Sequence, residues 1–122
     1  MTLKILAIDD SRTIREMLRM ALGSAGFDVH LASDGQEGIE VLPQVAPDIV
    51  ITDINMPRLD GFGVIEAIRG GTTLNTLPIL VLTTESAQDL KDRARNAGAT
   101  GWIVKPFDDA KLIGAIRRIA AV

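Results

Sequence analysis

The sequence predicts an α/β domain built as a doubly wound, five-stranded parallel sheet with five helices. Short apolar runs of strand length alternate five times with segments whose apolar residues recur at three- and four-residue spacing. Several of these runs are apolar throughout, which is typical of parallel strands buried on both faces. A length of 122 residues suits one domain, and an apolar content of 47% supplies a core. We therefore expect residues 1–122 to form a single domain.

The first strand and helix are marked by an apolar run and a serine that can cap a helix. Residues 3–8 have the length and composition of a buried strand. Ser11 can cap the following helix, and Gly26 lies where a left-handed residue would end it. The expected inward stripe of this helix comprises Ile14, Met17, Leu18, Ala21, Leu22 and Ala25.

The second strand and helix begin with an alternating segment. Apolar and polar residues alternate over residues 27–31, which predicts a strand with one exposed face. We interpret His30 on that face as a surface residue, because no other ligand-type residues are spaced around it. Ser33 or Asp34 can begin the next helix, and Pro43 should end or kink it.

Two further buried strands are expected at residues 49–51 and 79–82. The helix between them follows a turn rich in Asn, Pro, Asp and Gly, and Gly70 and Gly71 should stop it. Its expected inward residues are Phe62, Ile65 and Ile68.

The last two helices differ in the strength of their apolar stripes. Ser86 can cap the fourth helix, whose stripe is the thinnest of the five. A short fifth strand follows at residues 102–104, and Asp108 can cap the fifth helix. The inward residues are Leu90, Ala94 and Ala97 in the fourth helix, and Leu112, Ile113, Ile116 and Ile119 in the fifth.

The composition excludes several classes of protein. Thirteen Lys and Arg against sixteen Asp and Glu give a net charge of −3, which argues against nucleic acid as the partner. The absence of cysteine excludes disulfides and thiolate metal sites. No apolar run approaches the ~20 residues that span a bilayer, and the N-terminal residues lack a signal-peptide layout. We expect a cytoplasmic monomer that does not bind membranes.

Polar residues follow four of the predicted strands at the point where each strand ends: Asp9, Asp10, Asp53, Thr83, Thr84 and Lys105. Each could separately be a turn or cap residue. The carboxyl ends of parallel strands meet at one edge of the sheet, however, so these side chains should lie together. Three carboxylates at one edge repel, and a hard divalent cation such as Mg²⁺ relieves that repulsion.

These residues carry a resemblance to a known family. The motifs, in chain order, are Asp9-Asp10, Asp53-Ile54-Asn55-Met56-Pro57 with Asp60-Gly61, Thr83, and Lys105-Pro106-Phe107. The chain resembles the receiver domain of two-component response regulators from Leu3 to Ile119, and in particular the stand-alone chemotaxis members of that family. The resemblance implies a flavodoxin-like fold with strand order 2-1-3-4-5.

The resemblance also implies roles in phosphoryl transfer. Asp53 would be the phosphoacceptor, attacking a phosphohistidine on a sensor histidine kinase. Lys105 would neutralise charge on the phosphoryl oxygens, and the Thr83 hydroxyl would donate a hydrogen bond to them. The bond between Lys105 and Pro106 resembles a peptide bond that is cis in the family. In this interpretation the protein is a signalling phosphoacceptor that catalyses its own reactions and is not a dedicated enzyme.

The implied metal ligands form a second set. Asp10, Asp53 and the backbone carbonyl of Asn55 would bind Mg²⁺ directly, and Asp9 would act mainly through a water molecule. The implied cofactor is therefore Mg²⁺ alone.

Four residues concern switching and lifetime. Trp102 lies at the family's switch aromatic, usually Tyr or Phe, which turns inward when Thr83 moves; alternatively Trp102 is a packing residue. Asn55 and Glu85 resemble the positions that flank the attacking water. Thr84 departs from the small residue usual there, and we expect its side chain to narrow access.

Three other functions fit the sequence less well than that of a receiver domain. A haloacid-dehalogenase-type phosphatase needs a second acid two residues after its nucleophile, where Asn55 stands. A flavodoxin-like electron carrier needs a hydroxyl- and glycine-rich phosphate loop and aromatic residues that stack on the flavin. This sequence has neither feature. A degenerate receiver kept only for binding would lack a member of the site, and none is missing.

The output is expected to be a protein–protein contact, since no output domain follows Val122 in the sequence. A flagellar motor switch protein is the favoured target, bound by the face made of the fourth helix, the fifth strand and the fifth helix. The alternatives are a phosphorelay intermediate and a phosphate sink that drains a shared kinase.

Overall fold

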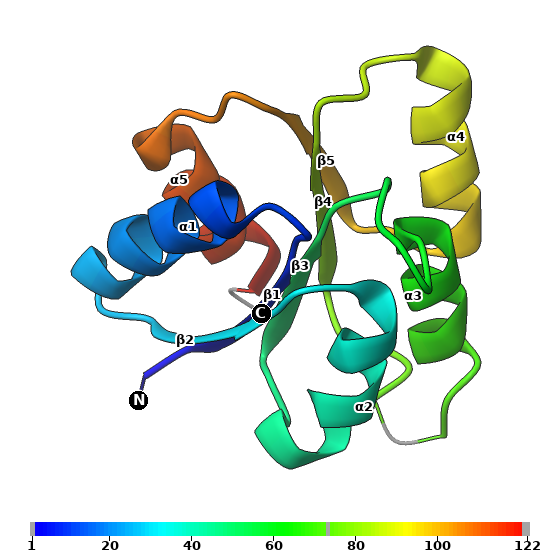
Figure 1. Ribbon diagram of the computed structural model, residues 1–122, viewed down its shortest axis with the longest axis horizontal. Coiled ribbons are helices and arrows are strands. Elements are labelled where there is room, and N and C mark those ends of the chain that lie inside the picture. Colours follow the sequence, from blue (N-terminus) through cyan, green and yellow to red (C-terminus); the bar gives the residue numbers. More distant parts are fainter. Residues whose placement is uncertain (1, 73, 121–122) are drawn as a thin grey trace.

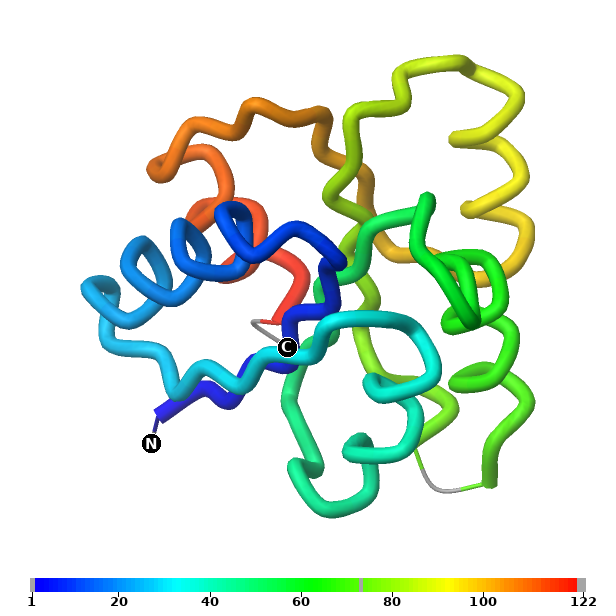
Figure 2. The backbone as a smooth tube through the Cα atoms, viewed as in Figure 1, coloured from blue at the N-terminus to red at the C-terminus, as the bar shows by residue number. Residues whose placement is uncertain are grey.

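A computed structural model describes residues 2–72 and 74–120. Strands and helices alternate along the chain, and the smooth trace in Figure 2 shows the repeated crossovers. The strands are β1 Lys4–Ile8, β2 Asp28–Ala32, β3 Ile49–Thr52, β4 Ile79–Thr83 and β5 Gly101–Val104. The helices are α1 Arg12–Ser24, α2 Gly35–Val45, α3 Gly61–Arg69, α4 Gln88–Ala97 and α5 Asp109–Ala120.

The strands form one parallel sheet in the order β2-β1-β3-β4-β5. Helices α1 and α5 cover one face of the sheet, and α2, α3 and α4 cover the other (Figure 1). The three inner strands β1, β3 and β4 therefore bury both of their faces, which explains why they are almost entirely apolar. The predicted doubly wound fold and its strand order are confirmed.

Two apolar layers stabilise this sandwich. The layer under α1 and α5 includes Leu18, Leu22 and Leu112, and the layer under α2, α3 and α4 includes Ile65 and Val81. Each of these side chains is almost completely withdrawn from solvent. Burial of each contributes about 1.5–3 kcal/mol, so the two layers dominate the stability of the sheet.

Most of the predicted helix caps are present. The Ser11 hydroxyl accepts a hydrogen bond from Ile14 N–H, and Asp34, not Ser33, caps α2 through Glu37 N–H. Asp108 caps α5 by accepting from Lys111 N–H at 3.1 Å. Gly26 has φ of 91°, the left-handed conformation expected after α1.

Two expectations need correction, and a third concerns Pro43. Met17 is 44% exposed, because the buried stripe of α1 is narrow and centred on Leu18 and Leu22. Ser86 does not cap α4: Ala87 occupies the cap position and offers no side-chain hydrogen bond. Pro43 lies in the last turn of α2, where a proline removes only one hydrogen bond, and the helix ends two residues later at Val45.

The register of the sheet brings the carboxyl ends of its central strands level. Ile8 pairs with Thr52, and Thr52 pairs with Val81. Asp53 N–H then donates to the Ile8 carbonyl at 3.0 Å, which continues the ladder one residue beyond the strand. Residues that follow β1, β3 and β4 are therefore held at one edge.

In the described part of the chain, no helix has the length and apolar character needed to cross a membrane.

Candidate functional site

A lysine and two carboxylates meet at the carboxyl edge of the sheet. Lys105 Nζ donates to Asp9 Oδ2 at 2.7 Å and to Asp53 Oδ2 at 2.9 Å. The Lys105 side chain is 9% exposed, and those of Asp9 and Asp53 are 2% and 10% exposed. These residues come from the ends of three different strands, so the parallel topology is what assembles the cluster.

Asp10 completes a group of three carboxylates. One carboxylate oxygen each from Asp9, Asp10 and Asp53 lies within 4.8 Å of the others, and Asp10 alone of the three is exposed. Three hard oxygen donors on one side, open to water on another, are the donor set that Mg²⁺ takes when it keeps several waters. The residues present therefore fit a divalent cation.

Backbone and side-chain donors hold the two buried carboxylates in place. Ser11 N–H donates to Asp9 Oδ1 at 2.9 Å, and Ile54 N–H donates to Asp53 Oδ1 at 2.6 Å. The Arg15 guanidinium donates to the Asp9 backbone carbonyl at 2.7 Å. Arg15 was not predictable from the sequence, because an arginine on the surface of a helix gives no sign of a contact with the preceding loop.

Burial and hydrogen bonding shift the pKa values of Asp9 and Lys105 in the cluster. Burial raises the pKa of the Asp9 carboxyl, although hydrogen bonds from Lys105 and from Ser11 N–H act in the opposite direction. Burial alone would lower the pKa of Lys105, but its hydrogen bonds to Asp9 and Asp53 outweigh burial and raise it. The ammonium thus stays protonated, and the Asp9 anion remains incompletely compensated.

Glu85 connects the other predicted residues on the β4 side of the cluster. Its Oε1 accepts from Asn55 Nδ2 at 2.9 Å, and its backbone carbonyl accepts from Trp102 Nε1 at 3.1 Å. Its N–H donates to the Thr83 hydroxyl oxygen at 3.4 Å. The family resemblance predicted Asn55 and Glu85 near the site, but no pattern in the sequence indicated that the Trp102 indole contacts Glu85.

The burial and backbone conformation of the remaining predicted residues can be stated briefly. Thr83 is fully buried and Thr84 is exposed. The Lys105–Pro106 peptide bond is cis, as the resemblance implies. The His30 side chain is 40% exposed, in agreement with its interpretation as a surface residue.

The chain thus combines a parallel α/β sandwich with an acidic cluster and a lysine at the carboxyl edge of its sheet. A family model described as the response regulator receiver domain matches residues 5–117. The chain belongs to the response regulator receiver domain family.

Individual relatives agree with this assignment. The chain is 40% identical over 117 residues to the response regulator MprA of Mycobacterium leprae, which covers 96% of this chain and 50% of that protein. It is 39% identical to the Vibrio cholerae chemotaxis protein CheY4, with a TM-score of 0.93 and coverage of 98% of this chain and 99% of that one. The chain spans about half the length of MprA and of the other curated relatives that it matches.

One solved relative bears on the acidic cluster. The receiver domain of the sensor histidine kinase PA1611 from Pseudomonas aeruginosa PAO1 is 25% identical, has a TM-score of 0.91 and covers all of both chains. Its structure has a magnesium ion coordinated in the active-site cleft. Receiver domains generally bind Mg²⁺ in an acidic site, and the cluster of Asp9, Asp10 and Asp53 is of that kind.

Proposed function

We propose that this protein accepts a phosphoryl group from the phosphohistidine of a sensor histidine kinase onto Asp53. The observation that carries the proposal is the placement of the Lys105 ammonium within 2.9 Å of Asp53 Oδ2, beside two more carboxylates at the end of the central strand. Receiver domains act in this way as signalling phosphoacceptors rather than as dedicated enzymes.

The transfer follows from the chemistry of the groups at the sheet edge. An Asp53 oxygen attacks phosphorus, a P–O bond forms, and the P–N bond to the kinase histidine breaks with its electron pair leaving on nitrogen, which is protonated. Lys105 turns its ammonium toward charge on the phosphoryl oxygens. The Thr83 hydroxyl oxygen accepts from Glu85 N–H, which leaves its own O–H free to donate to the phosphoryl group.

The acidic cluster would hold Mg²⁺ during transfer. Asp10, Asp53 and the backbone carbonyl of Asn55 are the proposed direct ligands, and Asp9 acts mainly through a water molecule. When bound, the cation neutralises charge on the carboxylates and the phosphoryl oxygens. Asp9 and Asp53 are already oriented for this role by the N–H groups of Ser11 and Ile54.

Output is proposed to leave through the face formed by α4, β5 and α5. Two grooves flank β5, of about 750 Å³ toward α5 and about 220 Å³ toward α4, and Trp102 lines both. Thr83 and Trp102 form the proposed switch pair. A flagellar motor switch protein is the favoured target, which the 39% identity to a chemotaxis protein supports.

A phosphorelay intermediate or a phosphate sink is the second candidate for the output. The similarity to MprA, only half of which the chain covers, favours neither candidate over the motor. In both cases we propose a cytoplasmic monomer that works through proteins, without nucleic acid or membrane as direct partner. The fully buried apolar layers and the net charge of −3 support this proposal.

Phosphoramidate, a small donor with the same P–N bond as phosphohistidine, tests the proposal without knowledge of the natural kinase. With Mg²⁺ it should phosphorylate the wild-type protein and not Asp53→Asn, and excess EDTA should prevent labelling of the wild type. Asp89→Asn is the matched control, because it removes an exposed carboxylate from α4, and it should label normally. Labelling of Asp53→Asn at the wild-type rate would contradict the assignment.

A further inference from the structure

We infer that Arg15 positions Asp10 for a divalent cation by holding the backbone carbonyl of Asp9. The inference rests on the proposed function, because it concerns the Mg²⁺ that Asp10 would bind. Its basis is the hydrogen bond from Arg15 Nη1 to the Asp9 carbonyl oxygen at 2.7 Å. Arg15 lies one turn after the Ser11 cap of α1, so this side chain ties the helix back to the end of β1.

Asp9 uses every one of its hydrogen-bonding groups. Its N–H donates to the Ala32 carbonyl at 3.1 Å, which extends the pairing of β1 with β2 by one residue. Its two carboxylate oxygens accept from Ser11 N–H and from Lys105 Nζ. Arg15 donates to the group that remains, the carbonyl oxygen. Because a buried carbonyl without a donor costs free energy, Arg15 is a necessary part of this arrangement.

The position of Asp10 depends on the orientation of the Asp9 carbonyl. That carbonyl and the Cα atom of Asp10 belong to one planar peptide unit, so a donor that fixes the carbonyl oxygen also fixes the direction in which the chain continues to Asp10. Within residues 2–72 and 74–120, no hydrogen bond or ion pair holds the Asp10 carboxylate itself. Asp10 is also the exposed member of the three carboxylates. Its place beside Asp9 and Asp53 therefore rests on its backbone.

The charge of Arg15 and its position have opposite effects on cation binding. A guanidinium next to Asp9 repels Mg²⁺, so its Coulomb effect alone would weaken binding. Its hold on the peptide unit between Asp9 and Asp10 presents a further hard oxygen ligand and strengthens binding, as groups that orient metal ligands do. Arg15 is partly exposed, so water and salt screen the repulsion, whereas the hydrogen bond is direct. Arg15 is thus a positioning residue and not a catalytic one.

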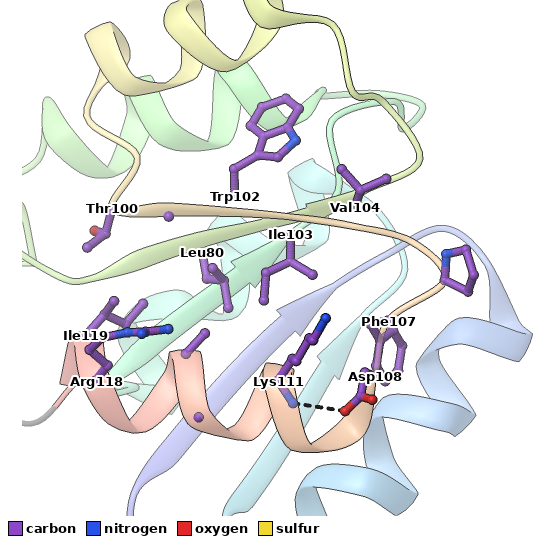
Figure 3. A pocket seen from close by; sticks show the side chains of 14 residues that line it. Leu80, Thr100, Trp102, Ile103, Val104, Phe107, Asp108, Lys111, Arg118 and Ile119 are labelled. Carbon is purple, nitrogen blue, oxygen red and sulfur yellow. Dashed lines mark hydrogen bonds between the residues drawn. The ribbon is translucent and has the colours of Figure 1, made fainter.

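Titration calorimetry of the unphosphorylated protein with Mg²⁺ tests the inference. Arg15→Met removes the donor and keeps an unbranched side chain, and it should bind Mg²⁺ about tenfold more weakly than wild type. Arg19→Met and Arg118→Met are the matched controls, since each removes an exposed arginine away from the Asp9 carbonyl. Arg19 lies one turn further along α1, and Arg118 lines the groove beside β5 near the end of α5 (Figure 3). Both controls should bind Mg²⁺ as wild type does.

Two further measurements separate positioning from a general loss of stability. The ¹³C chemical shift of the Asp9 carbonyl, which responds to the hydrogen bond that it accepts, should change in Arg15→Met and not in the controls. Arg15→Gln, whose amide nitrogen ends two bonds short of Nη1, should also weaken Mg²⁺ binding, and it replaces Arg15→Met if that variant does not fold. Unchanged or tighter Mg²⁺ binding in the folded Arg15 variants, or an unchanged Asp9 shift, overturns the inference. If wild type binds no Mg²⁺, the proposed metal site fails, and the carbonyl shift still decides whether Arg15 holds Asp9.

Discussion

At the scale of single residues, Asp9 is a buried carboxylate whose pKa is raised by burial despite its hydrogen bonds from Lys105 and Ser11 N–H. It is 1% exposed, it shares the Lys105 ammonium with Asp53, and burial raises its pKa. A raised pKa in the folded state means that the stability this group contributes is present below its ordinary pKa and is lost as pH rises through the raised value. The Asp9 carboxyl therefore favours the folded state less as pH rises through its raised pKa.

The first prediction concerns the removal of that charge. Asp9→Asn should raise the unfolding free energy of the metal-free protein by about 1 kcal/mol at neutral pH. The gain should shrink as pH falls below the raised pKa of Asp9, where the wild-type carboxyl is protonated. Urea unfolding in EDTA across that pH range measures both effects.

Mg²⁺ provides the control for this prediction. It should raise the melting temperature of wild type, because a bound cation stabilises the folded state alone, and should do so much less in Asp9→Asn. A variant that is destabilised without metal at neutral pH would show that the Lys105 pairing outweighs burial.

A second residue-scale prediction concerns Thr84, which is exposed in the loop after β4. Thr84→Ala removes a β-branched side chain beside the proposed path to Asp53. The variant should be phosphorylated faster by acetyl phosphate and should also lose phosphate faster. Ser86→Ala, an exposed hydroxyl residue in the same loop, is the control and should match wild type. Equal rates in Thr84→Ala and wild type would place Thr84 away from the path.

At the scale of elements, α4 is the helix least firmly attached to the sheet. Ala94 is its one buried residue, and its cap residue Ala87 makes no side-chain hydrogen bond. By contrast, α3 has an Asp60 cap and five buried residues. Elements with few buried contacts open at low free energy and are the ones that conformational switches use. The thin apolar stripe in the sequence predicted this weakness.

The third prediction tests the weakness at the start of α4. Ala87→Ser supplies the missing cap oxygen and should stabilise the helix by about 1 kcal/mol. Amide exchange within Gln88–Ala97 should slow by roughly fivefold as a result. Ser11→Ala is the converse control: it removes the existing cap of α1 and should lower stability by about 1 kcal/mol. Unchanged exchange in Ala87→Ser would mean that α4 is held by contacts other than its cap.

The element scale also shows how far the sequence could predict this molecule. Apolar runs and helical stripes identified all ten elements, because burial on both faces leaves a strand continuously apolar and burial of one face of a helix leaves a stripe at three- and four-residue spacing. The cap of α4 was misplaced by one residue, since Ser86 has the right chemistry and only the backbone path decides which residue begins the helix. The acidic cluster was predictable because parallel strands end at one edge. The bond from Trp102 to Glu85 was not, because it depends on the path of a loop.

At the scale of the whole molecule, the candidate site and the proposed output face lie in different parts of the fold. Asp9, Asp53 and Lys105 lie at the carboxyl edge of the sheet, and Trp102 lies on β5 at one side of it. Glu85 touches both Trp102 and Asn55, so a change at the edge has a direct physical route to the face of α4 and β5. A rigid sheet with one weakly held helix allows such a change without unfolding the core.

The fourth prediction uses Trp102 as the reporter of that change. The protein has one Trp and no Tyr, so emission excited at long wavelength comes from Trp102 alone. Beryllofluoride with Mg²⁺, a stand-in for the phosphoryl group, should alter this emission beyond the effect of Mg²⁺ and should reduce quenching by iodide as the ring becomes more buried. Identical quenching in both states would leave Trp102 as a static packing residue.

The central claim is that Asp53 carries the phosphoryl group, and its most direct test is to locate that group in the chain. After reaction with phosphoramidate and Mg²⁺, borohydride reduction converts an aspartyl phosphate into homoserine, which peptide mass spectrometry can assign to a position. We expect homoserine at position 53 and at no other aspartate, with none formed when EDTA is present. Homoserine at position 9 or 10, or an unmodified Asp53 in a phosphorylated protein, would contradict it.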